Sequence, residues 1–238
     1  TSDGSNLYLF ESVNIKIRQV AIATGVVTTL AGPAAGSTAS GDTDGTGTAA
    51  RFNAPTGITT DGTNLYVADF NNHKIRRIVI ATGVVTTLAG PAPGATTSGD
   101  TAATGNSARF NNPAGITTDG ANLYVADASN NKIRQVVIAT GVVTTLAGPA
   151  PGATTSGDTD ATGNTARLNF PFQLTYDGSN LFVADSLNNK IRRIDLATNA
   201  VTTPYGPAAG TTTLGDTDGT ANAARFNNPQ GLISDGTN

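Results

Sequence analysis

Two sets of charged residues recur along this 238-residue chain at spacings that could support chemistry. The first is Asp-x-Asp within Gly- and Thr-rich stretches, where alternate carboxylates can converge on a hard cation such as Ca²⁺. The weak calcium-ligand candidates are Asp42, Asp44, Asp158, Asp160, Asp216 and Asp218. One repeat carries Ala102 in place of its second Asp, and no Glu follows as a bidentate ligand. A solvated Asx turn explains the pattern better, so we expect neither a metal nor a cofactor.

The second set is a Lys-x-Arg pair that returns four times. The pairs are Lys16/Arg18, Lys74/Arg76, Lys132/Arg134 and Lys190/Arg192. Eight cations on one face would suit single-stranded RNA, but that recognition also needs aromatic platforms for the bases. Aromatic residues make up only 5% of this chain and its formal charge is −3. We therefore expect each Arg to form a salt bridge with an Asp of a neighbouring unit, and we expect no nucleic-acid partner.

Asn-rich turns follow the recurring phrase Val-Ala-Asp, because Asn tolerates the left-handed backbone region. The single histidine, His73, occupies one of these turns and is expected to be exposed. No Ser/His/Asp set, cysteine nucleophile or histidine cluster can be assembled from the sequence, so we predict a protein that is not an enzyme. The candidate binding residues in these turns are Asn72, His73, Asn130, Asn131, Asn188 and Asn189.

A 58-residue repeat must position all of these side chains. The phrase that begins Asp3-Gly4 returns at Asp61, Asp119 and Asp177, and it opens again at Asp235. A fixed period of this length indicates one supersecondary unit copied in space. We divide the chain into units of about 1–58, 59–116, 117–174 and 175–232, which together form a single domain, 1–238.

Each unit reads as four strands followed by one long connection. In the second unit the predicted strands are 57–61, 64–69, 74–81 and 84–89, and the connection runs over 90–107. Small antiparallel sheets repeated around an axis form an all-β β-propeller; a β-solenoid is the alternative. Ile75 and Ile78 are three residues apart, which predicts a bulge near Arg76 and Arg77. At the ends of the connections, Phe52, Phe110, Leu168 and Phe226 are expected to be buried.

The repeat resembles the NHL-repeat family. The resemblance rests on Phe52-Asn53-Ala54-Pro55-Thr56-Gly57-Ile58, on Asn64-Leu65-Tyr66-Val67-Ala68-Asp69, and on Lys74-Ile75-Arg76, which return in every unit with some variation. It implies four-stranded propeller blades and, usually, a binding platform. Six blades is the familiar number in this family, whereas this chain has four units. Amidating lyases with a similar fold hold zinc with several histidines, which this chain lacks.

The last residues are expected to close the ring. Residues 231–238 would complete the first blade, with 232–235 pairing with 6–11, so that four four-stranded blades form a closed propeller. Such pairing would remove an exposed sheet edge. In the two alternatives, the chain is a slice of a longer array, or two chains combine their blades. We expect a monomer, with a blade-sharing oligomer as the alternative.

We therefore predict a non-catalytic binding or scaffold propeller whose long connections face a protein or carbohydrate partner. The alternatives are a metal-dependent lyase or hydrolase and a single-stranded RNA-binding module. No apolar run approaches ~18 residues, so we expect no membrane span. The acidic, cysteine-free composition favours a bacterial extracellular or cell-surface protein. The absence of Met indicates a processed or excised segment of a longer chain.

Overall fold

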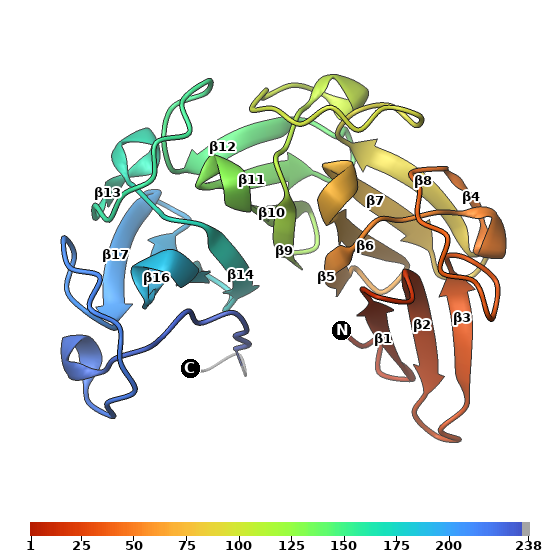
Figure 1. Ribbon diagram of the computed structural model, residues 1–238, viewed down its shortest axis with the longest axis horizontal. Helices are drawn as coiled ribbons and strands as arrows, with labels where there is room; N and C mark the ends of the chain where they lie inside the picture. Colours follow the sequence, from red (N-terminus) through yellow and green to blue (C-terminus); the bar gives the residue numbers. More distant parts are fainter. Residues whose placement is uncertain (235–238) are drawn as a thin grey trace.

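The computed structural model describes residues 1–234 and is built from antiparallel sheets. Four sheets follow one another in chain order around an arc (Figure 1). Sheet 1 contains β1 (Asn6–Glu11), β2 (Lys16–Ala21) and β3 (Val27–Ala31). Sheet 2 contains β4 (Gly45–Thr46), β5 (Pro55–Thr60), β6 (Asn64–Asp69), β7 (Lys74–Val79) and β8 (Val84–Ala89). Sheet 3 contains β9 (Pro113–Thr118), β10 (Asn122–Asp127), β11 (Lys132–Val137) and β12 (Val143–Ala147). Sheet 4 contains β13 (Ala161–Thr162), β14 (Pro171–Tyr176), β15 (Asn180–Asp185), β16 (Lys190–Asp195) and β17 (Ala200–Tyr205).

Short 3₁₀ turns occur in the long connections and in the turns that join the two middle strands of sheets 2, 3 and 4. They are η1 (Gly47–Ala49), η2 (Phe70–Asn72), η3 (Gly105–Ser107), η4 (Ala128–Asn130), η5 (Gly163–Thr165), η6 (Ser186–Asn188) and η7 (Ala221–Ala223). The strands β5, β9 and β14 lie towards the centre of the arc, and β9 contacts both of the others (Figure 1). No helix in the part of the chain that the structure describes is long and apolar enough to cross a membrane.

The hairpin between β5 and β6 illustrates how the sequence sets the strands. The carboxylate of Asp61 accepts hydrogen bonds from the backbone N–H groups of Thr63 (2.8 Å) and Asn64 (2.7 Å). Gly62 takes the positive φ that this tight turn requires (+89°). The hydroxyl of Tyr66 donates to the same carboxylate (2.7 Å), which ties the turn to the next strand. The strand predictions over 64–69 and 84–89 are confirmed.

Both faces of a sheet are buried, and this corrects the predicted bulge. Ile75 packs in a cluster with sheet 3, whereas Ile78 packs in a cluster with sheet 1. A separation of three places the two side chains on opposite faces of a regular strand, so no bulge is needed to bury both. The register shift lies between Ile75 and Arg76, opposite the extra residue Leu88 on β8. A bulge therefore does lie next to Arg76, as predicted, but its extra residue belongs to β8 and the burial of Ile75 and Ile78 is not its cause.

The apolar residue at the end of each of the first three connections fills the space between two sheets. Phe52, Phe110 and Leu168 have no exposed surface, as predicted. Phe52, for example, belongs to the cluster that joins Tyr8 of sheet 1 to Leu65 of sheet 2. Phe226 is only half-buried, which corrects the prediction for that position. No sheet follows it within residues 1–234 to cover its ring.

The closing strand pair is not formed in the structure. Residues 232–234 adopt no strand, and the backbone N–H of Ser234 donates to the Thr175 hydroxyl of sheet 4 (3.2 Å). The chain's own first residues occupy part of the edge of β1, since Tyr8 N–H donates to Thr1 C=O (2.9 Å) and Ser2 forms a bridge with Leu7. Sheet 1 therefore has three strands, and the arc is open between β1 and β14 (Figure 1). Residues 235–238 lie outside the described residues.

Candidate binding site

The Asp-Thr-Asp stretch in the connection after sheet 1 forms salt bridges with Lys and Arg side chains of sheet 2. Asp42 pairs with the ammonium of Lys74 (2.6 Å) and accepts a hydrogen bond from Gly94 N–H (2.8 Å). Asp44 pairs with Arg76 (2.7 Å) and accepts from Thr87 through its backbone N–H and its hydroxyl (both 3.1 Å). Burial alone would raise the pKa of Asp42, but Lys74 holds that pKa below its ordinary value. The connection from sheet 1 is thus fastened to sheet 2.

A second carboxylate completes the network around Arg76. Asp69 and Arg76 have no exposed surface, and their side chains lie 2.8 Å apart. Asp69 also accepts hydrogen bonds from Asn53 N–H (2.7 Å) and from the Asn72 amide (2.8 Å). The same amide donates to Gly41 C=O in the incoming connection (2.7 Å). We call this arrangement, in which Asp-x-Asp of one connection meets Lys-x-Arg of the next sheet, the ionic lock.

Sheets 3 and 4 contain the same lock with small changes. In sheet 4, Asp158 pairs with Lys190 (2.6 Å), and Asp160 pairs with Arg192 (2.7 Å). In sheet 3, Asp100 pairs with both Lys132 and Arg134, because Ala102 stands where the second Asp would be. Arg134 Nη2 consequently has no hydrogen-bond partner among the described residues. Burial raises the pKa of Asp127 and Asp185 to about 6, against the opposing effect of Arg134 and Arg192.

The predicted binding residues Asn72, Asn130 and Asn188 are not surface groups. All three are buried, and each amide donates both to the Asp of its own sheet and to a carbonyl of the incoming connection. Their role as turn formers was predicted, but their hydrogen bonds to the connection were not. Each of these side chains therefore links the buried Asp of its own lock to the incoming connection.

The other three predicted residues latch one sheet to the next. His73, Asn131 and Asn189 end their 3₁₀ turns in the left-handed region, with φ of 57° to 58°. His73 Nδ1 accepts from Asn112 N–H (3.0 Å), and Asn131 and Asn189 accept in the same way through Oδ1 from Phe170 and Asn228. His73 is half-buried, contrary to its predicted exposure, and burial lowers its pKa.

The six calcium-ligand candidates fall into two groups in the structure. Asp42, Asp44, Asp158 and Asp160 form salt bridges in locks, whereas Asp216 and Asp218 are exposed in the last connection. Within residues 1–234, no three His, Cys, Asp or Glu side chains are grouped so that they could hold a metal ion. The salt bridges between Arg and an Asp of the preceding connection confirm the predicted pairing for Arg76, Arg134 and Arg192, whereas Arg18 pairs with Glu11 of its own sheet.

The long connections also carry exposed residues that the locks do not use. In each connection, three exposed residues lie just before a Gly-Asp pair, and the Asp of this pair enters a lock in the first three connections. These stretches are 38–40, 96–98, 154–156 and 212–214. Residues 96–98 and 154–156 have the same sequence, Thr-Thr-Ser. Gly99 N–H, immediately after the second stretch, donates to Phe110 C=O (3.0 Å), so a buried plug fixes the end of the exposed segment.

A separate cavity of about 290 Å³ lies between the innermost segments of sheets 2, 3 and 4. Ile58, Thr117, Leu174 and Leu232 contribute to its lining. Gln173, at a position held by Gly57 and Gly115 in the other sheets, also lines it and donates to Thr56 C=O (3.5 Å). The lining consists mainly of aliphatic and Thr side chains and includes no charged side chain.

Sequence reasoning predicted the Arg–Asp salt bridges, but it did not predict that the Asp-rich stretches of the connections supply the carboxylates and also bind the Lys side chains. Each incoming Asp precedes its Lys by 32 residues, as in Asp42 and Lys74 or Asp158 and Lys190. That constant separation was a detectable signal, because the Asp and the Lys both recur with the 58-residue period.

Sequence comparison detects relatives for a little more than half of the chain. No model of a known protein family matches it. NHL repeat-containing protein 2 of Homo sapiens is 36% identical over 149 residues, which are 60% of this chain and 20% of that protein. The chain thus spans about a fifth of the length of the curated relatives that it matches.

Solved structures share the fold at low sequence identity. An auxiliary nutrient binding protein from Bacteroides thetaiotaomicron superposes with a TM-score of 0.68 at 17% identity, over 98% of this chain and 52% of that chain. A putative phosphatase from the same organism superposes with a TM-score of 0.57 at 17% identity, over 84% of this chain and 45% of that chain. These neighbours show the fold alone. Together with the repeated motifs, these sequence relatives support an NHL-repeat family for this chain.

Proposed function

We propose that the protein is a non-catalytic binding scaffold that presents its long connections to a protein or carbohydrate partner, outside the cell. The observation that carries the proposal is that the exposed stretches of the first three connections are short and are fastened on both sides. Before residues 96–98, Pro91 is buried; after them, Asp100 forms salt bridges with Lys132 and Arg134. A segment held in one conformation loses little entropy on binding. Such segments on a rigid scaffold are typical binding elements.

The chemistry of these stretches suits a polar, uncharged ligand surface. Residues 96–98 and 154–156 offer hydroxyl groups and no charged side chain. Hydroxyl groups both donate and accept hydrogen bonds, which matches sugar hydroxyls and peptide groups. The nutrient-binding name of one structural neighbour supports a binding role, although that name belongs to the neighbour.

The structure favours this function over the two alternatives. The basic ring required for RNA is occupied, since Lys74, Arg76 and their equivalents in sheets 3 and 4 are buried in ion pairs. A metal-dependent lyase or hydrolase would need free carboxylates, and Asp42 and Asp44 are bound to cations. One structural neighbour is named as a putative phosphatase, but that name identifies no catalytic residue in this chain.

The test replaces only the exposed stretch, because removing the whole connection would leave Lys132 and Arg134 without Asp100. The loop variant carries Thr96→Ala, Thr97→Ala, Ser98→Ala and the same three changes at 154–156. The matched control carries Thr82→Ala and Thr140→Ala, two exposed hydroxyls in the short turns before β8 and β12. Binding is measured on an oligosaccharide array and by selection from a peptide library.

We expect a probe bound by the parent protein to lose at least ~10-fold in affinity with the loop variant and to bind the control unchanged. A probe bound equally well by all three proteins would contradict the assignment of this surface. A parent protein that binds no probe in either collection would contradict the choice of partner class.

A further inference from the structure

The lock of sheet 3 lacks a carboxylate that the locks of sheets 2 and 4 contain. In sheet 2, Asp44 accepts hydrogen bonds from Arg76 Nη2 (2.7 Å) and from the hydroxyl and N–H groups of Thr87 (both 3.1 Å). In sheet 4, Asp160 accepts from the three equivalent groups at 2.7, 2.8 and 3.0 Å. Ala102 stands at this repeat position in the connection that enters sheet 3. A methyl group thus replaces the acceptor in one lock of the three.

Two of the donors at this position of sheet 3 have no acceptor. Arg134 Nη2 and the Thr145 hydroxyl, the counterparts of the groups on Arg76 and Thr87, are buried and have no hydrogen-bond partner among the described residues. Burial without an acceptor is unfavourable, because the donor has lost its hydrogen bonds to water. An anionic acceptor suits Arg134 best, since charge-assisted hydrogen bonds are stronger than neutral ones.

The backbone around Ala102 follows the path that it takes in the other two locks. Thr101 C=O accepts from Arg109 N–H (3.1 Å), as Thr43 C=O accepts from Arg51 N–H (3.0 Å). The β-carbon of Ala102 therefore lies where the second Asp side chain begins in those locks. Ala102 is exposed, so a ligand can reach this point from solvent. Sheets 2 and 4 lie on the two sides of sheet 3, so the site is in the interior of the described chain (Figure 1).

The charge balance of this lock also favours an anion. In sheet 2 two cations meet three carboxylates, and sheet 4 repeats this composition; the sheet 2 set is Lys74, Arg76, Asp42, Asp44 and Asp69. In sheet 3 two cations meet two carboxylates, and these are Lys132, Arg134, Asp100 and Asp127. One further carboxylate would give the lock of sheet 3 the same composition as the others, and the same fold already accommodates that composition twice.

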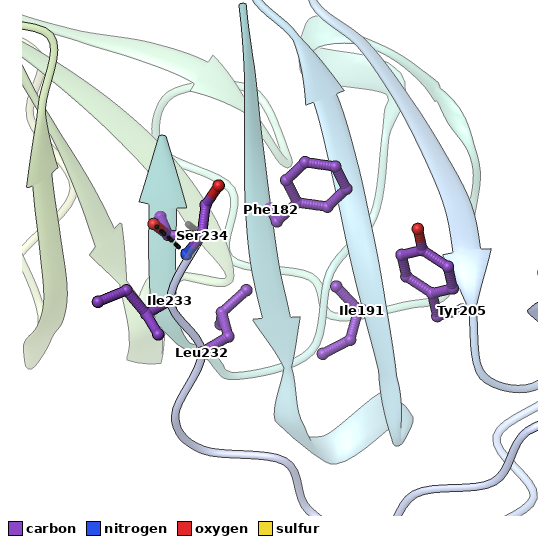
Figure 2. A pocket seen from close by; sticks show the side chains of 7 residues that line it. Phe182, Ile191, Tyr205, Leu232, Ile233 and Ser234 are labelled. Carbon is purple, nitrogen blue, oxygen red and sulfur yellow. Dashed lines mark hydrogen bonds between the residues drawn. The ribbon is translucent and has the colours of Figure 1, made fainter. Parts of the chain in front are cut away.

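An apolar cavity beside sheet 4 shows by contrast what an anion site requires. Figure 2 shows Phe182, Ile191 and Tyr205 of sheet 4 around a cavity of about 150 Å³, with residues 232–234 on its other side. No Lys or Arg lines this cavity. Burying an ionised carboxylate in such surroundings without a cation is strongly unfavourable. The lock of sheet 3 differs because it offers the cation together with donors that have no acceptor.

We propose that the lock of sheet 3 binds the carboxylate group of an external ligand, in the place that an Asp side chain takes in sheets 2 and 4. The ligand carboxylate accepts hydrogen bonds from Arg134 Nη2 and from the Thr145 hydroxyl. A free small carboxylic acid and the Asp or Glu side chain of a peptide present the same group. The proposal goes beyond the binding function above, which uses the hydroxyl groups of residues 96–98 and 154–156.

The experiment is a nuclear magnetic resonance titration of the isotope-labelled protein at neutral pH, with sodium formate as the probe. Total salt stays below ~0.1 M, where charged contacts are not strongly screened. The test variant is Ala102→Asp, which supplies the carboxylate from within the chain. The matched control is Ala139→Asp, which adds the same charge in the exposed turn between β11 and β12. We expect saturable shifts of the Arg134 and Thr145 signals in the parent and in the control, and none in Ala102→Asp.

The converse variant creates the same arrangement in another sheet. Asp44→Ala removes the carboxylate from the lock of sheet 2, so a saturable response to formate should appear at Thr87, where the parent has none. The response at Thr145 should remain. Circular dichroism shows whether the variant is folded, and Asp160→Ala provides the equivalent test in sheet 4 if it is not.

A second titration, with the blocked peptide Gly-Asp-Gly, distinguishes the two sources of the carboxylate. A peptide that binds at least as tightly as formate assigns the site to a peptide side chain, whereas a weaker peptide assigns it to a free acid. The absence of a saturable response to either probe in the parent would overturn the site and leave water as the partner of Arg134 and Thr145. An undiminished response in Ala102→Asp would overturn the assigned position. Sodium chloride shifts that match those of formate would overturn a carboxylate as the ligand.

Discussion

Sheets 1 and 2 have nearly the same sequence pattern and very different environments. Leu65 is fully buried in sheet 2, whereas Leu7, at the same repeat position, is 47% exposed. Arg76 is enclosed by two carboxylates, whereas Arg18 meets one glutamate near the surface. Leu7 and Leu65 are the same residue at the same repeat position, so their difference in exposure comes from the neighbour on the preceding side. Burial in this repeat protein is a property of the interface between units, as expected for architectures stabilised by nearest-neighbour contacts.

The largest expected effect is the difference in unfolding free energy lost by Arg76→Ala and by Arg18→Ala. Arg76→Ala leaves the buried Asp69 without its cation, which costs about 3–5 kcal/mol of unfolding free energy. Arg18→Ala removes a partly exposed pair and should cost about 0–1 kcal/mol. Urea unfolding of both variants measures the two losses. Equal losses would show that the neighbouring connection does not determine the energy of the pair.

The second test compares two leucines. Leu65→Ala opens a cavity in the cluster between sheets 1 and 2 and should cost about 2–5 kcal/mol. Leu7→Ala removes a half-exposed side chain and should cost less than ~1 kcal/mol. The same denaturation experiment applies. The comparison fails if Leu7→Ala is the more damaging change.

Glycines at one repeat position provide a purely steric test. A Cβ on Gly115 would lie 2.6 Å from Phe172 C=O, so β9 and β14 would have to separate. The same atom on Gly231 meets nothing within 4 Å. Gly115→Ala should cost about 1–3 kcal/mol, and Gly231→Ala should be nearly neutral. Thermal melting of the two variants would show no difference if the innermost strands could move apart freely.

The smallest expected effect is a dependence on pH. The pKa of Asp127 and Asp185 is about 6 in the folded protein and about 4 in an unfolded chain. The folded state therefore binds more protons between these values, and these two groups make stability fall as pH rises from about 4 to 6. The lowered pKa of Asp119 acts in the opposite sense, but its contribution is lost only below about pH 4.

Melting temperatures from pH 4.5 to 7.5 measure this slope in a His73→Asn background. That change removes the histidine, whose lowered pKa would oppose the effect, and it introduces the residue found at Asn131 and Asn189. Adding Asp127→Asn should flatten the profile by a few degrees, whereas adding Asp195→Asn should not. A profile that rises throughout this range would contradict the raised pKa values.

Local sequence patterns predicted the strands well because each strand is set by neighbours in sequence. Asp61 and Gly62 specify a turn, and the alternation that follows specifies β6. The lock between Asp42 and Lys74 was not predicted as a unit, because its partners lie 32 residues apart across a connection without periodicity. Propensity and spacing describe one element at a time, whereas this contact depends on how two elements meet.

The candidate site shows the same limit. Asn72 was expected at the surface because Asn is typical of exposed turns, but its amide is enclosed by Asp69 and Gly41. The predicted closing pair overlooked the first residues of the chain, which occupy the edge of β1 near Tyr8. Both differences depend on a second segment that packs at the same place, which is the incoming connection at Asn72 and the first residues of the chain at β1.

The order of charges along the chain has a consequence for synthesis. In every filled lock the acidic partner precedes the basic one, as Asp42 precedes Lys74 and Asp100 precedes Lys132. A nascent chain leaving the ribosome therefore exposes the carboxylates first, and each new Lys and Arg emerges when its counter-charge is already in place. Each sheet can then bury its cations as it forms, so the protein can be assembled in one direction without a buried charge waiting for its partner.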